Sequence, residues 1–471
     1  MSPSIPDSSV EHGVQQWLRE CRTAFCRDAN PRPTETERAA LVDRLAEVLR
    51  CASGGLDAEA AGSSAALALV LVEGALRLRA PGAVLDAHVF RMLGVSRSVP
   101  IGTPVALLPT PCLVLEIDRL DGNVRRMQAR ATSLGVQLRP HIKTSKSGAV
   151  AARAVGPGGP LTVSTLREAE SFAQQGFGDL TYAVAIVPDR LDRVARLSSA
   201  GIRVGLFVER LDVARALAAH PGRFEAFVEV DCGEDRTGAG STEEVLAIAQ
   251  TLHEAPRCRL RGIATHGGHS YGARSVIERV AIAEQERTAA VAAAEAVRAV
   301  GIPCPEVSVG STPTAVHATH LDGVTEMRPG VYILGDLFQA GIGSHGIDDI
   351  ACSVLSTVLS HRPRSGRVVI DAGGLALSKD RSTAGWPFDA GYGRLADAVS
   401  GALLEGLQVA SVHQEHGEVS AAGGIAPDRL PVGTRVRVLP NHICMTAAQY
   451  DRYHVVSEGR VVAVWPRVNG W

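Results

Sequence analysis

The stretch RVGLFVERLDVARALAAHPGRFEAFVEVDCG, residues 203–233, contains the repeating unit from which the fold can be predicted. Its two ends, 203–209 and 226–233, are short apolar runs typical of buried strands. Between them lies an Ala-rich segment whose apolar residues have helical spacing. Two strands joined through a helix run parallel, because parallel neighbours need a long crossover connection. This stretch therefore predicts one βαβ unit.

The same alternation of apolar runs and amphipathic helical segments extends on both sides of this unit. The eight runs cover residues 137–143, 161–165, 179–186, 203–209, 226–233, 260–268, 306–312 and 325–334. Eight βα units in roughly 200 residues match the size of one closed (β/α)8 barrel. An open doubly wound sheet is the alternative, but no Gly-x-Gly-x-x-Gly follows any of these runs, so a dinucleotide-binding fold has little support.

The regions on either side of the barrel have different patterns. Residues 1–100 have helical periodicity almost throughout and predict an additional N-terminal helical region, which a Pro- and Gly-containing connector separates from the barrel at 101–344. Residues 345–471 contain short alternating runs with turn residues between them, which predicts a C-terminal antiparallel β domain. A further apolar run, 112–117, precedes the first barrel helix and is a candidate strand of either the barrel or the β domain.

The composition of the chain excludes several classes of function. Of its 471 residues, 45% are hydrophobic and 21% charged, and the formal net charge is -2 with both signs mixed along the chain. No basic face for nucleic acid is visible, so we expect no nucleic-acid partner. The most apolar stretch, 65–72, is too short to span a bilayer. Nine scattered cysteines without Cys-x-x-Cys spacing, and no apparent signal peptide, indicate a cytoplasmic protein with reduced thiols.

Reactive residues of such a barrel lie at the C-terminal ends of its strands. The first run ends in RPHIKTSK, which places Lys143 next to His141 at the barrel mouth. A lysine is usually a solvated surface charge, but at this place it can be desolvated, and its free amine could form an imine with an aldehyde cofactor. Lys143 is therefore the first candidate catalytic residue.

Two later strand ends carry further candidates. The sixth run leads into GGHSYG, which contains Tyr271, although a tight turn with a packed tyrosine is the structural alternative. The seventh ends at Gly310, Ser311 and Thr312, whose small side chains, backbone N–H groups and hydroxyls suit a phosphate. Phosphate sites recur after barrel strands seven and eight. A simple turn is the alternative for this segment.

The C-terminal domain contains a candidate metal pair in RVRVLPNHICMTAAQYD. His442 and Cys444 are two residues apart, so on an extended chain both side chains face the same side. A nitrogen and sulfur pair favours zinc over magnesium. A buried structural cysteine is the alternative.

Taken together, these motifs resemble the D-serine dehydratase and D-threonine aldolase family, which consists of pyridoxal-phosphate enzymes of fold type III with an alanine-racemase-like barrel and a β domain. The motifs run in order from about residue 103 to the end of the chain and include RPHIKTSK, GGHSY, VSVGSTPT, VIDAGGLALSKD and PNHICMT. The chain departs from the family pattern at Ser145, where the family commonly has histidine, and at Leu334 and Gly335, where it usually has an aromatic residue.

The resemblance implies a role for each candidate. Lys143 matches the lysine that binds pyridoxal 5'-phosphate, and His141, Tyr271, Gly310, Ser311 and Thr312 match segments that hold this coenzyme. A divalent metal is implied at His442 and Cys444, with zinc favoured and manganese or magnesium as alternatives. The resemblance also implies a homodimer with shared active sites.

The implied reaction is a lyase reaction on a small D-3-hydroxy amino acid. Dehydration to a 2-keto acid and ammonia is favoured, because the metal pair is His-x-Cys rather than His-x-Asp. Retro-aldol cleavage to glycine and an aldehyde is the alternative, and it uses the same groups. A metal-free amino acid racemase and a non-catalytic coenzyme-binding protein are two further alternatives; the β domain with PNHIC argues against the second.

Overall fold

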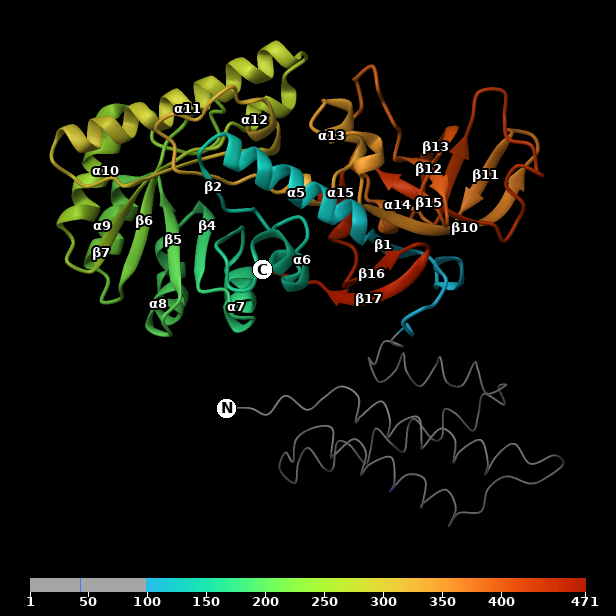
Figure 1. The fold of residues 1–471 in the computed structure, drawn as a ribbon, viewed down its shortest axis with the longest axis horizontal. Helices are drawn as coiled ribbons and strands as arrows, with labels where there is room; N and C mark the ends of the chain where they lie inside the picture. The colour runs from blue at the N-terminus through green and yellow to red at the C-terminus, as the bar shows by residue number, and fades with distance from the viewer. Residues whose placement is uncertain (1–42, 44–98) are drawn as a thin grey trace. The chain divides into compact units, whose positions relative to one another are not determined.

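A computed structural model of the chain describes Asp43 and residues 99–471 (Figure 1). The chain divides into two compact units, Met1–Ser98 and Val99–Trp471. The predicted N-terminal helical region thus lies almost wholly outside the described residues. The second unit contains both predicted β structures.

The first sheet is an eight-stranded parallel barrel. Its strands, in spatial order, are β2 (Gln137–Leu138), β9 (Glu326–Met327), β8 (Glu306–Val309), β7 (Cys258–Ala264), β6 (Phe224–Glu229), β5 (Arg203–Val208), β4 (Asp179–Ala185) and β3 (Leu161–Val163). A parallel bridge between His141 and Thr162 joins the β2 segment to β3 and completes the ring. The predicted barrel is therefore confirmed, with a strand overlapping each of the eight predicted runs, although β6 and β7 each begin two residues before their run.

The runs predicted at 137–143 and 325–334 are much longer than the strands they form. Only two residues of each pair as a strand. Beyond Met327 the chain turns into the 3-10 helix η4 (Val331–Ile333), and beyond Leu138 it turns towards Lys143. The apolar residues of both runs are buried because they pack in the core between the two domains' strands, not because they extend a strand.

Helices cover the outside of the barrel, the first of them before strand β2 and the others after barrel strands (Figure 1). They are α5 (Ile117–Ser133), α6 (Gly148–Val155), α7 (Leu166–Gln174), α8 (Leu191–Ser199), α9 (Leu211–Ala219), α10 (Thr242–Glu254), α11 (Val276–Ala299) and α12 (Thr312–His317). Thr165, Ser241 and Ser275 each begin a helix by accepting a backbone N–H with the side chain. No helix in the described part of the chain is long and apolar enough to cross a membrane.

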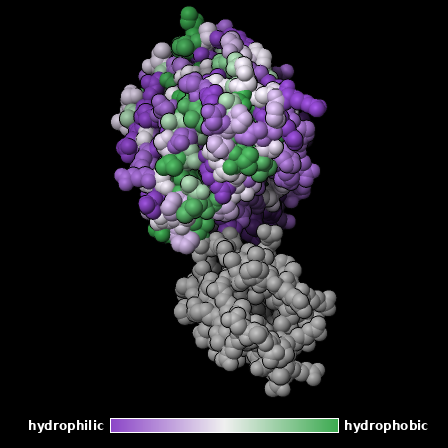
Figure 2. All heavy atoms as spheres, turned by 90° about the vertical axis from the view of Figure 1, so that its right-hand side faces the viewer, coloured by the Kyte–Doolittle hydropathy of each residue, from purple (hydrophilic) through white to green (hydrophobic). Residues whose placement is uncertain are grey.

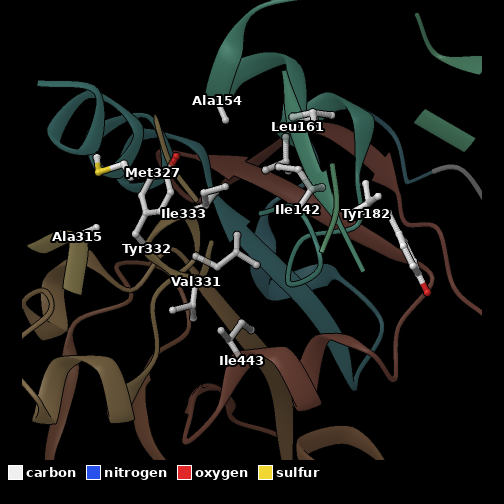
Figure 3. Close-up of a cluster of buried hydrophobic side chains, with 14 of the residues drawn as sticks. Ile142, Ala154, Leu161, Tyr182, Ala315, Met327, Val331, Tyr332, Ile333 and Ile443 are labelled. Atoms are coloured by element: carbon white, nitrogen blue, oxygen red, sulfur yellow. The ribbon is translucent and has the colours of Figure 1, made fainter. Parts of the chain in front are cut away.

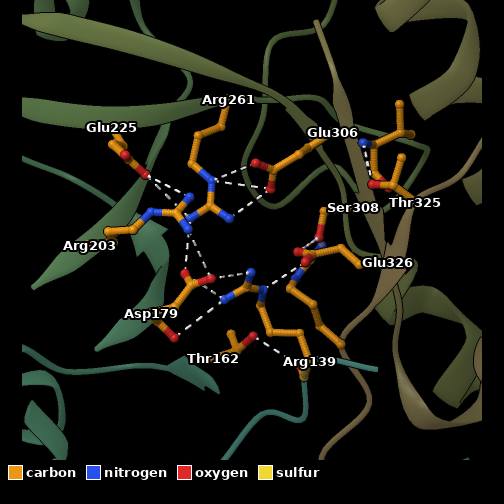
Figure 4. A network of polar contacts seen from close by, with 12 residues as sticks. Arg139, Thr162, Asp179, Arg203, Glu225, Arg261, Glu306, Ser308, Thr325 and Glu326 are labelled. Carbon is orange, nitrogen blue, oxygen red and sulfur yellow. Dashed lines mark hydrogen bonds and ion pairs between the residues drawn. The ribbon is translucent and has the colours of Figure 1, made fainter. Parts of the chain in front are cut away.

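The barrel interior contains an ionic network, which Figure 4 shows. Arg139 lies between Asp179, at 3.0 Å, and Glu326, at 2.7 Å. Arg261 binds Glu306 at 2.7 Å and stands 4.9 Å from the ring centroid of Phe227. Because charged groups are costly to bury unless they are paired, this network neutralises the floor of the barrel.

The second sheet is antiparallel except for one pairing and has nine strands. Its order is β11 (Arg367–Ile370), β14 (Gly417–Ser420), β13 (Leu403–Val412), β12 (Gly393–Asp397), β15 (Arg435–Pro440), β10 (Cys352–Arg362), β1 (Cys112–Glu116), β16 (Arg452–Ser457) and β17 (Arg460–Pro466). β11 also pairs with β10, so the strands from β10 to β15 close a small barrel. The run at 112–117, left open by the sequence, supplies β1 of this sheet. Figure 2 shows the face on this side, where hydrophobic side chains are scattered among hydrophilic ones.

One hydrophobic core connects the barrel to the β domain. Ile142 and Ile443 are both fully buried in it, together with Val331 (Figure 3). Ile142 stands between His141 and Lys143, and Ile443 between His442 and Cys444. Each buried isoleucine therefore fixes the backbone that carries a pair of candidate site residues.

Candidate active site

Lys143 lies in the turn after β2, at the end of the barrel where the strands finish. Its side chain is exposed, so the desolvation expected from the sequence is wrong for the single chain. The neighbouring Ile142 and Thr144 are buried and hold the turn in place. The amine is therefore accessible from a firmly anchored backbone.

Two histidines adjoin this lysine. Burial, followed by the charge of Lys143, lowers the pKa of His141 well below its usual range and that of His266 to about 3. Both imidazoles are therefore neutral at pH 7. His141 Nδ1 lies 3.4 Å from the backbone N–H of Lys143 and accepts its hydrogen bond, and His266 Nδ1 lies 2.8 Å from the Gly310 carbonyl, to which it donates. His141 thus presents an Nε2–H donor and His266 an Nε2 acceptor.

The predicted phosphate segment follows β8. Gly310 has a φ of +126°, and a Cβ at this position would lie 2.8 Å from the backbone nitrogen of Arg328, so only glycine fits. The Ser311 hydroxyl caps α12 and contacts Ser270 Oγ at 3.0 Å. Thr312 Oγ1 is buried without a hydrogen-bond partner among the described residues. Of the two hydroxyls, that of Thr312 is thus the one left for a ligand.

Glu286 of α11 supports this segment from behind. Its Oε1 accepts the backbone N–H of Gly267 at 2.5 Å and that of Gly310 at 3.1 Å. Burial raises the pKa of this carboxyl, and these hydrogen bonds partly oppose the rise. One buried side chain therefore fixes the two loops that carry His266 and Ser311.

Tyr271 belongs to the 3-10 helix η3 (Gly268–Gly272) and stacks on Phe338 of α13 (Leu337–Gly341) at a ring distance of 6.3 Å. Burial and then the charge of Cys444 raise the pKa of its hydroxyl. Tyr271 therefore stays protonated at pH 7. Its hydroxyl lies close enough to the Thr312 backbone and to the Cys444 thiol for both to affect its pKa.

The conformation expected for His442 and Cys444 is wrong. β15 ends at Pro440, His442 caps the short helix α15 (Ile443–Ala447), and Cys444 lies inside that helix rather than on an extended chain. The two side chains still interact. Burial raises the pKa of the Cys444 thiol, but His442 more than offsets this, so that the pKa is lowered. Burial lowers the pKa of His442, but Asp380 and Cys444 more than offset this, so that the pKa is raised. His442 precedes the helix and Cys444 lies in its first turn, so strand alternation is not what brings the two side chains together.

A direct contact joins the lysine segment to this pair. Thr144 Oγ1, on the residue after Lys143, lies 3.1 Å from Cys444 Sγ. These residues are 300 positions apart in the chain. The barrel mouth and the His442–Cys444 pair are therefore neighbours within one subunit.

Several functional candidates were missed in the sequence. His266 precedes the GGHSY motif, and its strand-end position was a usable signal. Asp380 and Asp336 flank His442, but they are remote from it in sequence and carry no spacing pattern. No group of three metal-ligating side chains occurs among the described residues, so the chain itself offers only a pair. Glu415 and His416, which also stood out in the sequence, are exposed in the β13–β14 turn.

Family models match both halves of the described region. The N-terminal domain of alanine racemase matches residues 115–337, and a putative serine dehydratase domain matches residues 351–456. Together they define a fold-type III enzyme whose class uses pyridoxal phosphate.

Individual relatives narrow the class further. D-threo-3-hydroxyaspartate dehydratase of Delftia sp. is 45% identical over 77% of this chain and 98% of that protein. 3-Hydroxy-D-aspartate aldolase of Paracoccus denitrificans is 30% identical over 76% of this chain and 91% of that protein. A solved structure of the Delftia sp. enzyme superposes with a TM-score of 0.76 at 43% identity, covering 78% of this chain and 100% of that one.

The chain belongs to the alanine racemase-like, fold-type III family of D-serine dehydratases, D-threo-3-hydroxyaspartate dehydratases and D-threonine aldolases. Its members are pyridoxal-phosphate lyases, so the predicted family and enzyme class are confirmed. Two further solved structures are of variants of the D-threo-3-hydroxyaspartate dehydratase. In one, a histidine is replaced by alanine. In the other, a cysteine two positions after that histidine is replaced by alanine, and this structure is of the metal-free form.

Proposed function

We propose that this protein is a pyridoxal-phosphate- and divalent-metal-dependent dehydratase of D-3-hydroxy amino acids, with D-threo-3-hydroxyaspartate as the first substrate to test. The observation that carries the proposal is the 3.1 Å contact between Thr144 and Cys444. It brings an exposed lysine at a barrel mouth next to an imidazole–thiol pair. A lyase that needs both an amine and a cation at one substrate would require this arrangement.

The residues at the barrel mouth fit the coenzyme. Lys143 would hold its aldehyde carbon, and the segment of Gly310, Ser311 and Thr312 would hold its phosphate. The buried, unpartnered hydroxyl of Thr312 supports this fit, because a buried hydroxyl without a partner is costly. His141 and Tyr271 would line the ring of the coenzyme.

The His442–Cys444 pair fits a soft divalent cation. An imidazole and a thiol with a lowered pKa are the donors that zinc prefers. Manganese and magnesium, which prefer oxygen ligands, remain the alternatives. The substrate and water would complete the coordination, since the described chain offers only two ligands.

When bound, the coenzyme supplies an electron sink for the bond broken at Cα of the substrate. The chain's own groups do the rest. The Lys143 amine would take the α-proton, while His442 and Cys444 would hold the cation that helps the 3-hydroxyl group to leave. The departing hydroxide and the proton taken from Cα together make one molecule of water. Neutral His266 would accept a hydrogen bond at the barrel mouth without adding positive charge there. The product then hydrolyses to a 2-keto acid and ammonia.

Retro-aldol cleavage is the second candidate, because a relative with 30% identity is an aldolase. It would require that the 3-hydroxyl lose its proton instead of leaving. The thiol at Cys444 and the 45% identity to a dehydratase favour elimination. A homodimer is also part of the proposal, supported by exposed Leu375 and Met445 beside the metal pair, which an apolar partner surface would cover.

The test is incubation of the purified protein, loaded with pyridoxal phosphate, with a panel of D- and L-3-hydroxy amino acids, with and without a chelator. Ammonia and a keto acid from D-isomers, lost with the chelator and restored by zinc, are the expected result. Glycine and an aldehyde would identify an aldolase. Formation of the enantiomer unaffected by the chelator would identify a racemase.

A binding test separates the coenzyme from the reaction. Lys143→Ala is expected to lose the visible absorbance of the lysine-bound coenzyme, while Lys146→Ala, in the same segment but paired with Glu168 at 2.9 Å, keeps it. Retention of the band in Lys143→Ala would mean that another lysine binds the coenzyme.

A further inference from the structure

We propose that Asp380 is a positioning residue for the metal: it holds the His442 ring so that Nε2 faces Cys444 and the cation. This inference rests on the proposed function, because it assumes that His442 and Cys444 bind a metal. It concerns a residue that would act on the metal through His442.

The contact between the two side chains is short and specific. Asp380 Oδ2 lies 2.7 Å from His442 Nδ1. The other oxygen, Oδ1, accepts a hydrogen bond from Ser382 Oγ at 2.7 Å. Both carboxylate oxygens of Asp380 are therefore hydrogen-bonded. This restricts rotation of the carboxylate and fixes the position of the oxygen that accepts the His442 N–H.

This contact decides which ring nitrogen is available. A neutral imidazole carries one N–H and one lone pair. Because Nδ1 donates its proton to Asp380, the lone pair of the neutral ring that would bind the metal is on Nε2. Metal-bound histidines generally donate their other ring N–H to such an acceptor, and loss of that acceptor typically costs 10- to 100-fold in metal affinity.

The segment that carries Asp380 is fixed to the metal segment by the residue next to His442. Asn441 donates from Nδ2 to Thr383 Oγ1 and to the Gly391 carbonyl, both at 2.6 Å. Its Oδ1 accepts the backbone N–H of Thr383 at 3.2 Å. Thr383 and Asn441 are both buried. The loop 378–392 is thus attached to the same backbone as the histidine that it orients.

Aromatic side chains fix the outer part of the loop. Trp386 packs edge-on against Phe338 at 5.9 Å, and the guanidinium of Arg274 lies 3.9 Å from the Trp386 ring centroid. Phe338 in turn stacks on Tyr271. A loop held at Thr383, Trp386 and Gly391 gives Asp380 a defined position, as a positioning residue requires.

The test is a titration of the metal-free, coenzyme-loaded protein with cobalt(II), followed by the charge-transfer absorbance of cobalt bound to a thiolate. Asp380→Ala is expected to bind cobalt 10- to 100-fold more weakly than the unsubstituted protein. Asp380→Asn keeps a carbonyl that can accept the Nδ1–H and is expected to lie between them. The coenzyme absorbance stays unchanged in both. The matched control is Asp192→Asn, which removes a carboxylate 3.2 Å from His220 on the barrel surface and leaves cobalt affinity unchanged.

Each outcome has one meaning. Unchanged cobalt affinity in Asp380→Ala overturns the inference and leaves the proposed function intact. If the unsubstituted protein gives no thiolate band, or Cys444→Ala keeps it, the metal pair itself is wrong and both proposals fail. Should Asp380→Ala not fold, Asp380→Asn alone decides: wild-type affinity overturns the inference, and weaker binding with intact coenzyme absorbance supports it.

Discussion

Glu326→Gln is expected to be strongly destabilising, because it breaks an ion pair in the barrel interior. Glu326 and Arg139 have side-chain exposures of 3% and 2%, and Glu326 Oε2 accepts from Arg139 Nε at 2.7 Å. Its other oxygen accepts from Ser308 Oγ at 2.5 Å. Glutamine keeps the shape of the side chain but removes its charge, which leaves the buried guanidinium with Asp179 as its remaining carboxylate.

Removing one partner of a buried pair costs about 3–5 kcal/mol in free energy of unfolding. We expect a loss near 3 kcal/mol, because Asp179 still compensates part of the charge on Arg139. The assay is urea-induced unfolding at one protein concentration, comparing midpoints and slopes. The control is Asp212→Asn, whose partner Arg210 lies at 2.9 Å with both side chains 65% exposed. A pair exposed in this way contributes little to stability, because solvent screens the attraction between the two charges.

A loss in Glu326→Gln no larger than that in Asp212→Asn would refute the reasoning. A second comparison uses the double variant Arg139→Met with Glu326→Leu, which removes both charges. It is expected to be more stable than Glu326→Gln, because the buried charge of Arg139 is removed together with its partner. Since Arg139 precedes His141 and Lys143 by only a few residues, Glu326→Gln should also weaken coenzyme retention.

Three further outcomes are expected. Gly310→Ala should lower the free energy of unfolding by about 1–3 kcal/mol and weaken coenzyme binding, because alanine cannot adopt the backbone conformation of Gly310 without strain against Arg328. Gly272→Ala, with open space around it, should change the midpoint of the same urea assay little. Ile443→Ala should lower the free energy of unfolding, measured with urea, by about 2–5 kcal/mol and also lower the affinity for cobalt. No change in either quantity would contradict the anchoring role of Ile443. His266→Gln should make the stability of the coenzyme-free protein less dependent on pH between about 6.5 and 3. Burial and then the nearby Lys143 keep the pKa of folded His266 at about 3, so as the pH falls the unfolded chain takes up a proton that the folded chain does not, and stability is lost across that window. Equal slopes of stability against pH in both proteins would refute this.

The alternation of apolar runs with helical segments was enough to predict the barrel. Period and spacing are local properties, so residues 203–233 could be identified as a βαβ unit from the chain alone. The same pattern placed Lys143 and Gly310 at strand ends. It could not give strand lengths, because in the runs at 137–143 and 325–334 burial comes from packing between domains.

The contacts between distant segments of the chain were decided only by the tertiary structure. The sequence left the run at 112–117 between two units, and pairing with β10 and β16 placed it in the second sheet. Thr144 and Cys444 meet across 300 residues, and Asp380 and His442 across 62. No local pattern encodes such contacts, since they depend on how two separately patterned domains pack on one core. The sequence determined which residues have the required chemistry, and the packing around Ile142 and Ile443 determined which of them act together.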